Sequence, residues 1–301
     1  MTDGNSNWTA VFVHGIFSSG DTFDAMADAF DKSPAFARWA PYNYNYNRSM
    51  EENASRLAAK IKDVAAPVVL VCHSMGGLIA RLAVLSGDVP NVRRVIMLGT
   101  PNFGAIRTAK AGLLAQLALR TTGRIAAVFR RPGILELTRV TRLLAEPIRQ
   151  GEKFARDVEY VTIPGTFFNE SRETDLASAW TFLFASLEVG ADLLRLVPFW
   201  RSEMARPHDG IVEEASNDLL PFGAGRLSEK RATLLDPGKY GFTYAHIRID
   251  QCDELTHVMI HKDPEIISLV TRIAGSLSLM EWFNSLTPEE RLRIVIEPRP
   301  R

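Results

Sequence analysis

The chain has 301 residues, of which 46% are hydrophobic, and its 35 basic and 35 acidic residues give a formal net charge of +0. This balance argues against a nucleic-acid partner, because proteins that bind nucleic acid usually carry a basic excess. The two cysteines, Cys72 and Cys252, are too few to form a disulfide framework. Residues 1–8 contain neither the basic nor the apolar stretch of a secretory signal, so we expect a cytoplasmic location.

The amino-terminal part of the chain is predicted to contain strands and helices in turn. Thr9 to Val13 is typical of a short strand, and it runs into His14-Gly15-Ile16. Asp21 to Phe30 spaces its apolar residues as a helix does. Trp39 to Tyr46 alternates aromatic and polar residues, which indicates either a strand or a loop over a pocket mouth. Ser49 to Val64 begins with a serine followed three residues later by a glutamate, which predicts the start of a helix.

The stretch from Val68 to Arg81 joins an apolar run to a serine, two glycines and a helical pattern. Val68 to Val71 is apolar without alternation, which is typical of a strand buried on both faces. A serine on so sharp a turn between strand and helix projects its hydroxyl above the sheet edge, and small neighbours let helix and strand pass closely. The alternatives are a glycine-rich turn that is only structural, or one that cradles a phosphate.

This turn resembles the nucleophile elbow of the α/β-hydrolase family, in particular that of its lipase and esterase branch. Cys72 departs from the family pattern, in which a glycine is usual at that position. The resemblance implies the α/β-hydrolase fold, a mostly parallel sheet flanked by helices with helical caps over the carboxyl edge of the strands. It also implies that Ser74 is the nucleophile of a triad whose chain order is serine, acid, histidine.

The resemblance extends to His14-Gly15-Ile16, because lipases place a His-Gly-x segment after an early strand. It implies an oxyanion hole in which the backbone N–H groups of Ile16 and Met75 stabilise the charge that acyl transfer builds on an oxygen. The supporting positions of these two turns are expected to be His14, Gly15, His73 and Gly76. Taken alone, residues 9–16 are also consistent with a strand that ends in a polar turn.

The middle of the chain is predicted to alternate core strands with helical insertions. Val92 to Leu98 and Val158 to Ile163 have strand patterns, and the turn after the first is expected to be structural. Residues 105–157 are expected to form two or three basic amphipathic helices that could attract an anionic membrane or a partner chain. Asp175 to Trp200 is apolar on most of its circumference, but three charges in its second half argue against a membrane span. It is expected to be a buried cap helix, and the alternative is a lid that contacts acyl chains or a lipid surface.

These patterns divide the chain into core parts and insertions. The first part of the hydrolase core is expected to span residues 1–105, followed by a helical cap insertion at 106–157, a core strand at 158–166, a second cap or lid insertion at 167–205, and the rest of the core with the carboxyl-terminal helices at 206–301. Within this last part, residues 226–250 are expected to hold two strands, and Asp-Pro and Thr-Pro pairs at 263–264 and 287–288 are expected to start helices.

The acid of the triad is predicted to be Asp209. It begins an Asp-Gly-Ile-Val run that resembles the acid loop of lipases, with a serine shortly after it. An Asp-Gly pair is also a common turn, and Asp250 and Asp253 remain alternatives that fit the spacing less well.

The base is predicted to be His257, because the resemblance favours a loop histidine that is followed by a few apolar residues and then by a helix start. His261 is the alternative. The four-residue spacing of this pair would also permit zinc, but the glutamate of an H-E-x-x-H motif is absent and no cysteine cluster assists. We therefore expect neither a metal nor a cofactor.

The sequence thus predicts a serine hydrolase that cleaves carboxylic esters through an acyl-enzyme, of lipase, esterase or lysophospholipase kind, with an acyl ester or lipid as substrate. A thioesterase or amidase of the same fold is an alternative, because the triad alone does not choose the leaving group. A hydrolase-fold interaction or sensor module without turnover is another. Peripheral membrane contact is expected through the cap helices, and no oligomeric state is predicted.

Overall fold

A single parallel sheet organises the part of the chain that the structure describes. The computed structural model describes residues 8–16, 18–46, 48–85, 89–102, 157–165, 212, 219, 243–247, 249, 255 and 257–294. Six strands pair in the order β2-β1-β3-β4-β5-β6, and every neighbouring pair is parallel. The strands are β1 (Trp8–Val13), β2 (Phe36–Tyr42), β3 (Val68–His73), β4 (Val92–Leu98), β5 (Glu159–Ile163) and β6 (Thr243–His246).

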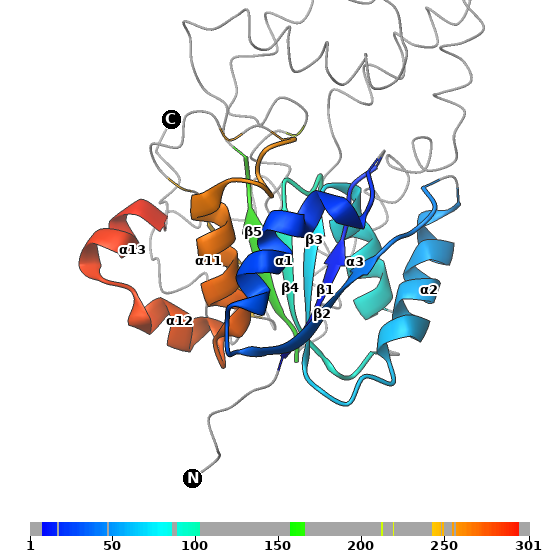
Figure 1. Cartoon of the computed structure of the whole chain (residues 1–301), viewed down its shortest axis with the longest axis horizontal. Helices are drawn as coiled ribbons and strands as arrows, with labels where there is room; N and C mark the ends of the chain where they lie inside the picture. The colour runs from blue at the N-terminus through cyan, green and yellow to red at the C-terminus, as the bar shows by residue number, and fades with distance from the viewer. Residues whose placement is uncertain are drawn as a thin grey trace, which may run out of the picture.

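Helices cover both faces of this sheet, so the predicted fold class is confirmed (Figure 1). Helices α1 and α11 lie on one face, whereas α2 and α3 lie on the other. The described helices are η1 (Gly20–Phe23), α1 (Asp24–Asp31), α2 (Met50–Ile61), α3 (Met75–Leu85), α11 (Pro264–Gly275), α12 (Leu279–Ser285) and α13 (Pro288–Ile294). The predicted cap segments, residues 106–157 and 167–205, lie outside the described residues except for Asp157.

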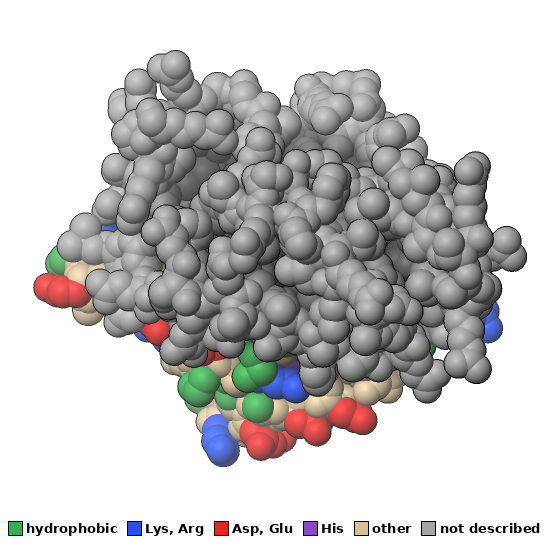
Figure 2. Space-filling model, turned by 90° about the horizontal axis from the view of Figure 1, so that it is seen from above, with side chains coloured by type: hydrophobic (Ala, Val, Ile, Leu, Met, Phe, Trp, Pro, Cys, Tyr) green, Lys and Arg blue, Asp and Glu red, His purple; other side chains and the backbone are tan. Residues whose placement is uncertain are grey.

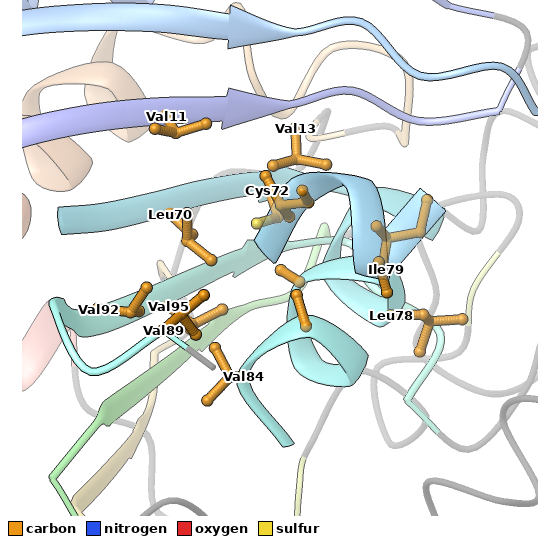
Figure 3. Close-up of a cluster of buried hydrophobic side chains, with 14 of the residues drawn as sticks. Val11, Val13, Leu70, Cys72, Leu78, Ile79, Val84, Val89, Val92 and Val95 are labelled. Atoms are coloured by element: carbon orange, nitrogen blue, oxygen red, sulfur yellow. The ribbon is translucent and has the colours of Figure 1, made fainter. Parts of the chain in front are cut away.

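The side chains of the strands alternate between two separate hydrophobic clusters. Val11, Val13, Leu70 and Cys72 point toward α2 and α3, as Figure 3 shows. Residues between them, such as Phe12 and Val71, pack with α1 and α11 on the other face. Because both faces are covered, these strands are apolar without alternation, as the sequence predicted. Cys72, which replaces the usual glycine, is accommodated because its side chain lies in the α2–α3 cluster.

Helix starts follow the local signals in the sequence. The Ser49 hydroxyl accepts a hydrogen bond from the backbone N–H of Glu52 at 3.0 Å, so the predicted capping box begins α2. At α11, the Asp263 carboxylate accepts from the N–H groups of Glu265 and Ile266 at 2.9 and 3.0 Å, with a proline at the first helical position. These contacts satisfy N–H groups that have no partner within the helix.

Two elements differ from the sequence prediction. Residues 39–46 were predicted to be a strand or a loop, and they are a strand only as far as Tyr42: β2 begins at Phe36 and ends where its partner strand β1 ends opposite at Val13. Helix α12 was not predicted. Its signal was present, because the Ser278 hydroxyl caps the N–H of Glu281 at 3.1 Å.

A buried arginine connects the sheet to helices α11 and α12. Arg94 of β4 is fully buried, and its Nε donates to a carboxylate oxygen of Glu159 on β5 at 2.8 Å. The same guanidinium donates to the backbone carbonyls of Ile273, Ala274 and Ser276 at the end of α11. The other oxygen of Glu159 accepts from the N–H of Leu279, the first residue of α12, at 2.8 Å. One ion pair therefore holds two strands and two helices together.

The described surface is chemically mixed where Figure 2 displays it. Hydrophobic, acidic and basic side chains lie next to one another along the lower margin of that view. Within the described ranges, no helix is both long and apolar enough to span a lipid bilayer.

Candidate active site

Ser74 lies between the end of β3 and the start of α3 in an unusual backbone conformation. Its φ is 53°, and no other non-glycine residue in the described ranges has a positive φ. Such a conformation is uncommon for a residue with a Cβ and is kept only when the surroundings impose it. Here the N–H of Ser74 donates to the Leu98 carbonyl at the end of β4, at 2.9 Å, and its own carbonyl accepts from the N–H of Gly77 at 3.1 Å.

The two glycines after the serine allow this turn to pack against its neighbours. A Cβ at Gly76 would overlap the carbonyl oxygen of Val13 and lie 2.5 Å from that of His14. A Cβ at Gly77 would lie 2.7 Å from the Thr100 methyl group, in the turn after β4. The start of α3 therefore touches the carboxyl ends of both β1 and β4, as the close passage predicted from the sequence requires.

The loop after β1 lies directly on Ser74. A Cβ at Gly15 would be 3.1 Å from the Ser74 Cβ and 2.9 Å from His73 Nδ1. Ile16, the predicted oxyanion donor, follows in the same loop. Met75, the other predicted donor, is the first residue of α3, where a helix leaves its N–H groups without intrahelical partners. The structure thus brings both predicted donor segments to the nucleophile turn.

His14 contacts Tyr44. The two rings stack with centroids 4.2 Å apart and planes inclined by 4°. His14 Nδ1 bonds the Gly15 carbonyl at 2.7 Å, and the N–H of Tyr44 donates to His14 Nε2 at 3.3 Å. The Tyr44 hydroxyl donates to the His14 carbonyl at 2.9 Å. Burial lowers the pKa of His14 below its ordinary value, so this ring is neutral near pH 7.

His73 links the nucleophile turn to the loop that carries the predicted base. Its Nε2 donates to the backbone carbonyl of His257 at 2.8 Å. The rings of these two residues lie 4.8 Å apart, and the ring of His261 lies 4.5 Å from that of His73. Burial, together with these two neighbouring histidines, holds the pKa of His73 well below its ordinary value. The ring is therefore neutral, with its proton on Nε2.

The two candidate bases differ in their contacts. His257 is buried to 5% exposure in the turn before α11, beside the residue that precedes Ser74. His261 instead hydrogen-bonds the Thr22 hydroxyl through Nε2, and burial lowers its pKa to about 4. Because its Nε2 is engaged by Thr22, His261 fits a structural role. Among the described residues no group of histidines, cysteines and carboxylates could hold a metal ion, which leaves the expected absence of a metal a prediction.

The sequence model of the alpha/beta hydrolase family matches residues 10–268, from β1 into the first turn of α11. The chain belongs to the alpha/beta hydrolase family. The matched span contains the nucleophile turn, the loop after β1 and both candidate bases. Among curated proteins, nothing matches this sequence.

Two solved structures of a bacterial lipase have a similar fold. The mature form of the Bacillus licheniformis lipase BlEst2 is 18% identical, with a TM-score of 0.57, over 89% of this chain and 92% of that one. The propeptide form of the same lipase is also 18% identical, with a TM-score of 0.57, over 91% of this chain and 51% of that one. At this identity the similarity shows a shared fold.

The acid of this alpha/beta hydrolase stays a prediction. Asp209, Asp250 and Asp253 all lie outside the described residues. Nearby along the chain, Val212 is buried, as is Leu219, whose N–H donates to the hydroxyl oxygen of Tyr244 at 3.0 Å. The described residues thus contain two of the three predicted triad members.

Tyr44 and Thr22 contact the site but were not singled out in the sequence. Tyr44 lies in the aromatic and polar run that was predicted to be a strand or a pocket loop, and nothing in that run distinguishes it from Tyr42 or Tyr46. A signal for Tyr44 would have been its position just beyond the end of β2, at the same sheet edge as His14. Thr22 carries no comparable signal, because 239 residues separate it from His261.

Proposed function

We propose that this alpha/beta hydrolase cleaves carboxylic esters through an acyl-enzyme, as lipases, esterases and lysophospholipases do. The observation that carries the proposal is the backbone of Ser74, with its φ of 53° at the end of the central strand β3. A strained turn of this kind presents a serine hydroxyl at the carboxyl edge of the sheet. The Gly15 loop lies against the serine, and the His257 turn is bonded to the preceding residue.

The proposed chemistry assigns one role to each residue. His257 accepts the proton of the Ser74 hydroxyl as the oxygen attacks the ester carbonyl, and Asp209 orients the imidazole. The N–H groups of Ile16 and Met75 hold the oxyanion, and each such donor lowers the barrier by about 3 kcal/mol. The imidazolium then protonates the leaving alcohol. Water repeats the same steps on the acyl-enzyme and releases the carboxylic acid.

Family membership and the fold shared with a bacterial lipase support this proposal, and they favour hydrolysis over a purely structural turn. We further propose that residues 106–157 and 167–205 form the cap that selects the acyl chain. Their contact with a lipid surface, a cytoplasmic location and the absence of a cofactor stay predictions from the sequence.

Replacement of Ser74 by alanine tests the proposal directly. Ser74→Ala should lower turnover of p-nitrophenyl esters to the level of buffer, because a methyl group cannot attack the carbonyl. The matched control is Ser55→Ala, which removes the same hydroxyl from an exposed position on α2 and should retain full activity. Circular dichroism should show that both variants are folded.

A fluorophosphonate probe provides an independent readout. It should label the unaltered chain and Ser55→Ala, but not Ser74→Ala, because only an activated serine reacts with it. Undiminished activity of Ser74→Ala would contradict the proposal. Absence of labelling together with absence of turnover would favour the non-catalytic module. If labelling is positive, a panel of esters, thioesters and anilides identifies the leaving group.

A further inference from the structure

The hydrogen bonds of His14 identify its protonated nitrogen. The backbone N–H of Tyr44 can only donate, so His14 Nε2, 3.3 Å away, is the acceptor and carries no proton. The carbonyl of Gly15 can only accept, so His14 Nδ1, 2.7 Å away, carries the proton. Both ring nitrogens are therefore used, by one neutral tautomer, in a side chain that is 1% exposed.

This tautomer determines the direction of the peptide bond between Gly15 and Ile16. The described residues contain no cis peptide, and in a trans peptide the C=O and N–H point in opposite directions. Since the Gly15 carbonyl points toward the His14 ring, the N–H of Ile16 points away from it. The preceding peptide is held in the same way, because the His14 carbonyl accepts from the Tyr44 hydroxyl at 2.9 Å.

Tyr44 is rigidly placed. It is 7% exposed, and its ring stacks on His14 on one side of the hydrophobic cluster between the sheet and α2. Burial holds the pKa of its hydroxyl well above the ordinary value, so the group is a permanent hydrogen-bond donor near neutral pH. The two residues come from the ends of adjacent parallel strands, β1 and β2, and thus share the sheet edge at which Ser74 lies.

We propose that His14 and Tyr44 form a clamp that holds the Ile16 N–H toward the oxyanion above Ser74. The His14–Tyr44 clamp acts on the peptides and not on the substrate, so both members are positioning residues. The inference rests on the proposed function and deepens it. Oxyanion donors stabilise a transition state because they are oriented before the reaction, and a peptide that rotates freely loses that advantage.

Variants of His14 separate its donor from its volume. His14→Leu fills a similar volume with an apolar side chain but removes the hydrogen bond to the Gly15 carbonyl. It should lower kcat about 10- to 100-fold with KM nearly unchanged. His14→Asn should recover most of this loss, because an amide nitrogen can occupy the place of Nδ1 and donate to the same carbonyl.

Variants of the two neighbouring tyrosines provide a matched pair. Tyr44→Phe removes the hydroxyl that donates to the His14 backbone carbonyl. Tyr42→Phe removes a buried hydroxyl that donates instead to the Asn53 carbonyl on α2, at 2.8 Å. Both changes delete one buried hydrogen bond and should shift the unfolding midpoint similarly. Only Tyr44→Phe should lower kcat, by about 3- to 10-fold.

The decisive measurement uses a trifluoromethyl ketone, which forms a tetrahedral oxyanion on a reactive serine, and the corresponding methyl ketone, which binds mainly in the ground state. His14→Leu and Tyr44→Phe should weaken the binding of the trifluoromethyl ketone by the same factor by which they lower kcat. They should change the affinity for the methyl ketone by no more than about twofold. Tyr42→Phe should change neither. A role limited to folding would alter both inhibitors equally or neither.

Each result has one meaning. Turnover in Ser74→Ala would overturn the proposed function itself. If Ser74→Ala is inactive but the clamp variants lose affinity for both inhibitors in parallel, the proposed clamp is wrong and the proposed serine chemistry stands. If His14→Leu fails to fold, Tyr44→Phe decides alone, and equality with Tyr42→Phe in the trifluoromethyl ketone assay overturns the clamp.

Discussion

At the scale of single residues, two histidines of the site hydrogen-bond backbone carbonyls. His14 and His73 both donate a ring proton to a carbonyl, one in the loop after β1 and the other in the turn before α11. Both rings are buried and neutral. A donor of this kind fixes the path of a loop without adding charge near the nucleophile, which suits a site where His257 is proposed to acquire charge during the reaction.

His73→Leu should loosen the turn that carries His257. Because it removes the buried hydrogen bond that His73 Nε2 donates to the His257 carbonyl, we expect a loss of about 1–3 kcal/mol in the free energy of unfolding. Because it also frees the proposed base, kcat should fall by about tenfold or more. Steady-state kinetics and urea unfolding measure the two effects. His73→Gln should restore both in large part, since its amide nitrogen can reach the position of Nε2, and an unaltered kcat in His73→Leu would show that this bond does not position the base.

At the scale of elements, Arg94 explains how α11 is held against the sheet at the end opposite the site. Its cationic head meets the last carbonyls of α11, where the helix dipole is negative. Burial lowers the pKa of Arg94, and the adjacent Glu159 carboxylate opposes this shift, so the guanidinium stays charged. Because α11 follows the His257 turn directly, the anchor also limits where that turn can lie.

Arg94→Met should destabilise the fold strongly, by about 3–5 kcal/mol, because it removes a fully buried guanidinium from its ion pair with the partly buried Glu159 and takes a donor away from the buried carbonyls at the end of α11. The matched control is Arg93→Met, whose exposed side chain precedes it on β4 and whose loss should cost less than about 0.5 kcal/mol. Thermal and urea unfolding of both variants give the comparison. Equal stability of the two would mean that the anchor does not contribute.

At the scale of the whole molecule, three buried histidines make stability depend on pH. The folded state holds the pKa of His14, His73 and His261 below the ordinary value of 6.5, that of His261 at about 4. Below about pH 6.5 the unfolded chain therefore binds more protons than the folded chain. The contribution of these histidines to the free energy of unfolding is complete above about pH 6.5 and decreases as the pH falls toward 4. For His261 alone the decrease amounts to about 3 kcal/mol.

Urea unfolding at intervals from pH 7 to pH 5 tests this dependence, above the range in which most carboxylates titrate. His261→Gln removes one titrating group while its amide can still bond Thr22, so its unfolding free energy should fall less steeply over the same range. A curve that is flat between pH 7 and pH 5 in the unaltered chain would contradict the expected proton uptake.

Features encoded by a few adjacent residues were determined by the sequence itself. The N-caps at Ser49 and Asp263 and the turn at Ser74 each depend on residues within a few positions of one another, so the sequence predicts them locally. The buried strand β3 follows in the same way from the apolar run that begins at Val68. Where pairing between strands sets the end of an element, as at Tyr42 at the end of β2, the local pattern predicted a strand that extends too far.

Contacts between distant segments were decided only by the tertiary structure. Tyr44 reaches His14 across 30 residues, and His73 reaches His257 across 184. His257 and His261 lie four residues apart, and the residues around them do not indicate what each one bonds. In the fold, the His257 carbonyl bonds the nucleophile turn, whereas His261 bonds Thr22. The physical reason is that these bonds depend on which strand ends share an edge and which helix faces meet, and neither property belongs to any short stretch of chain.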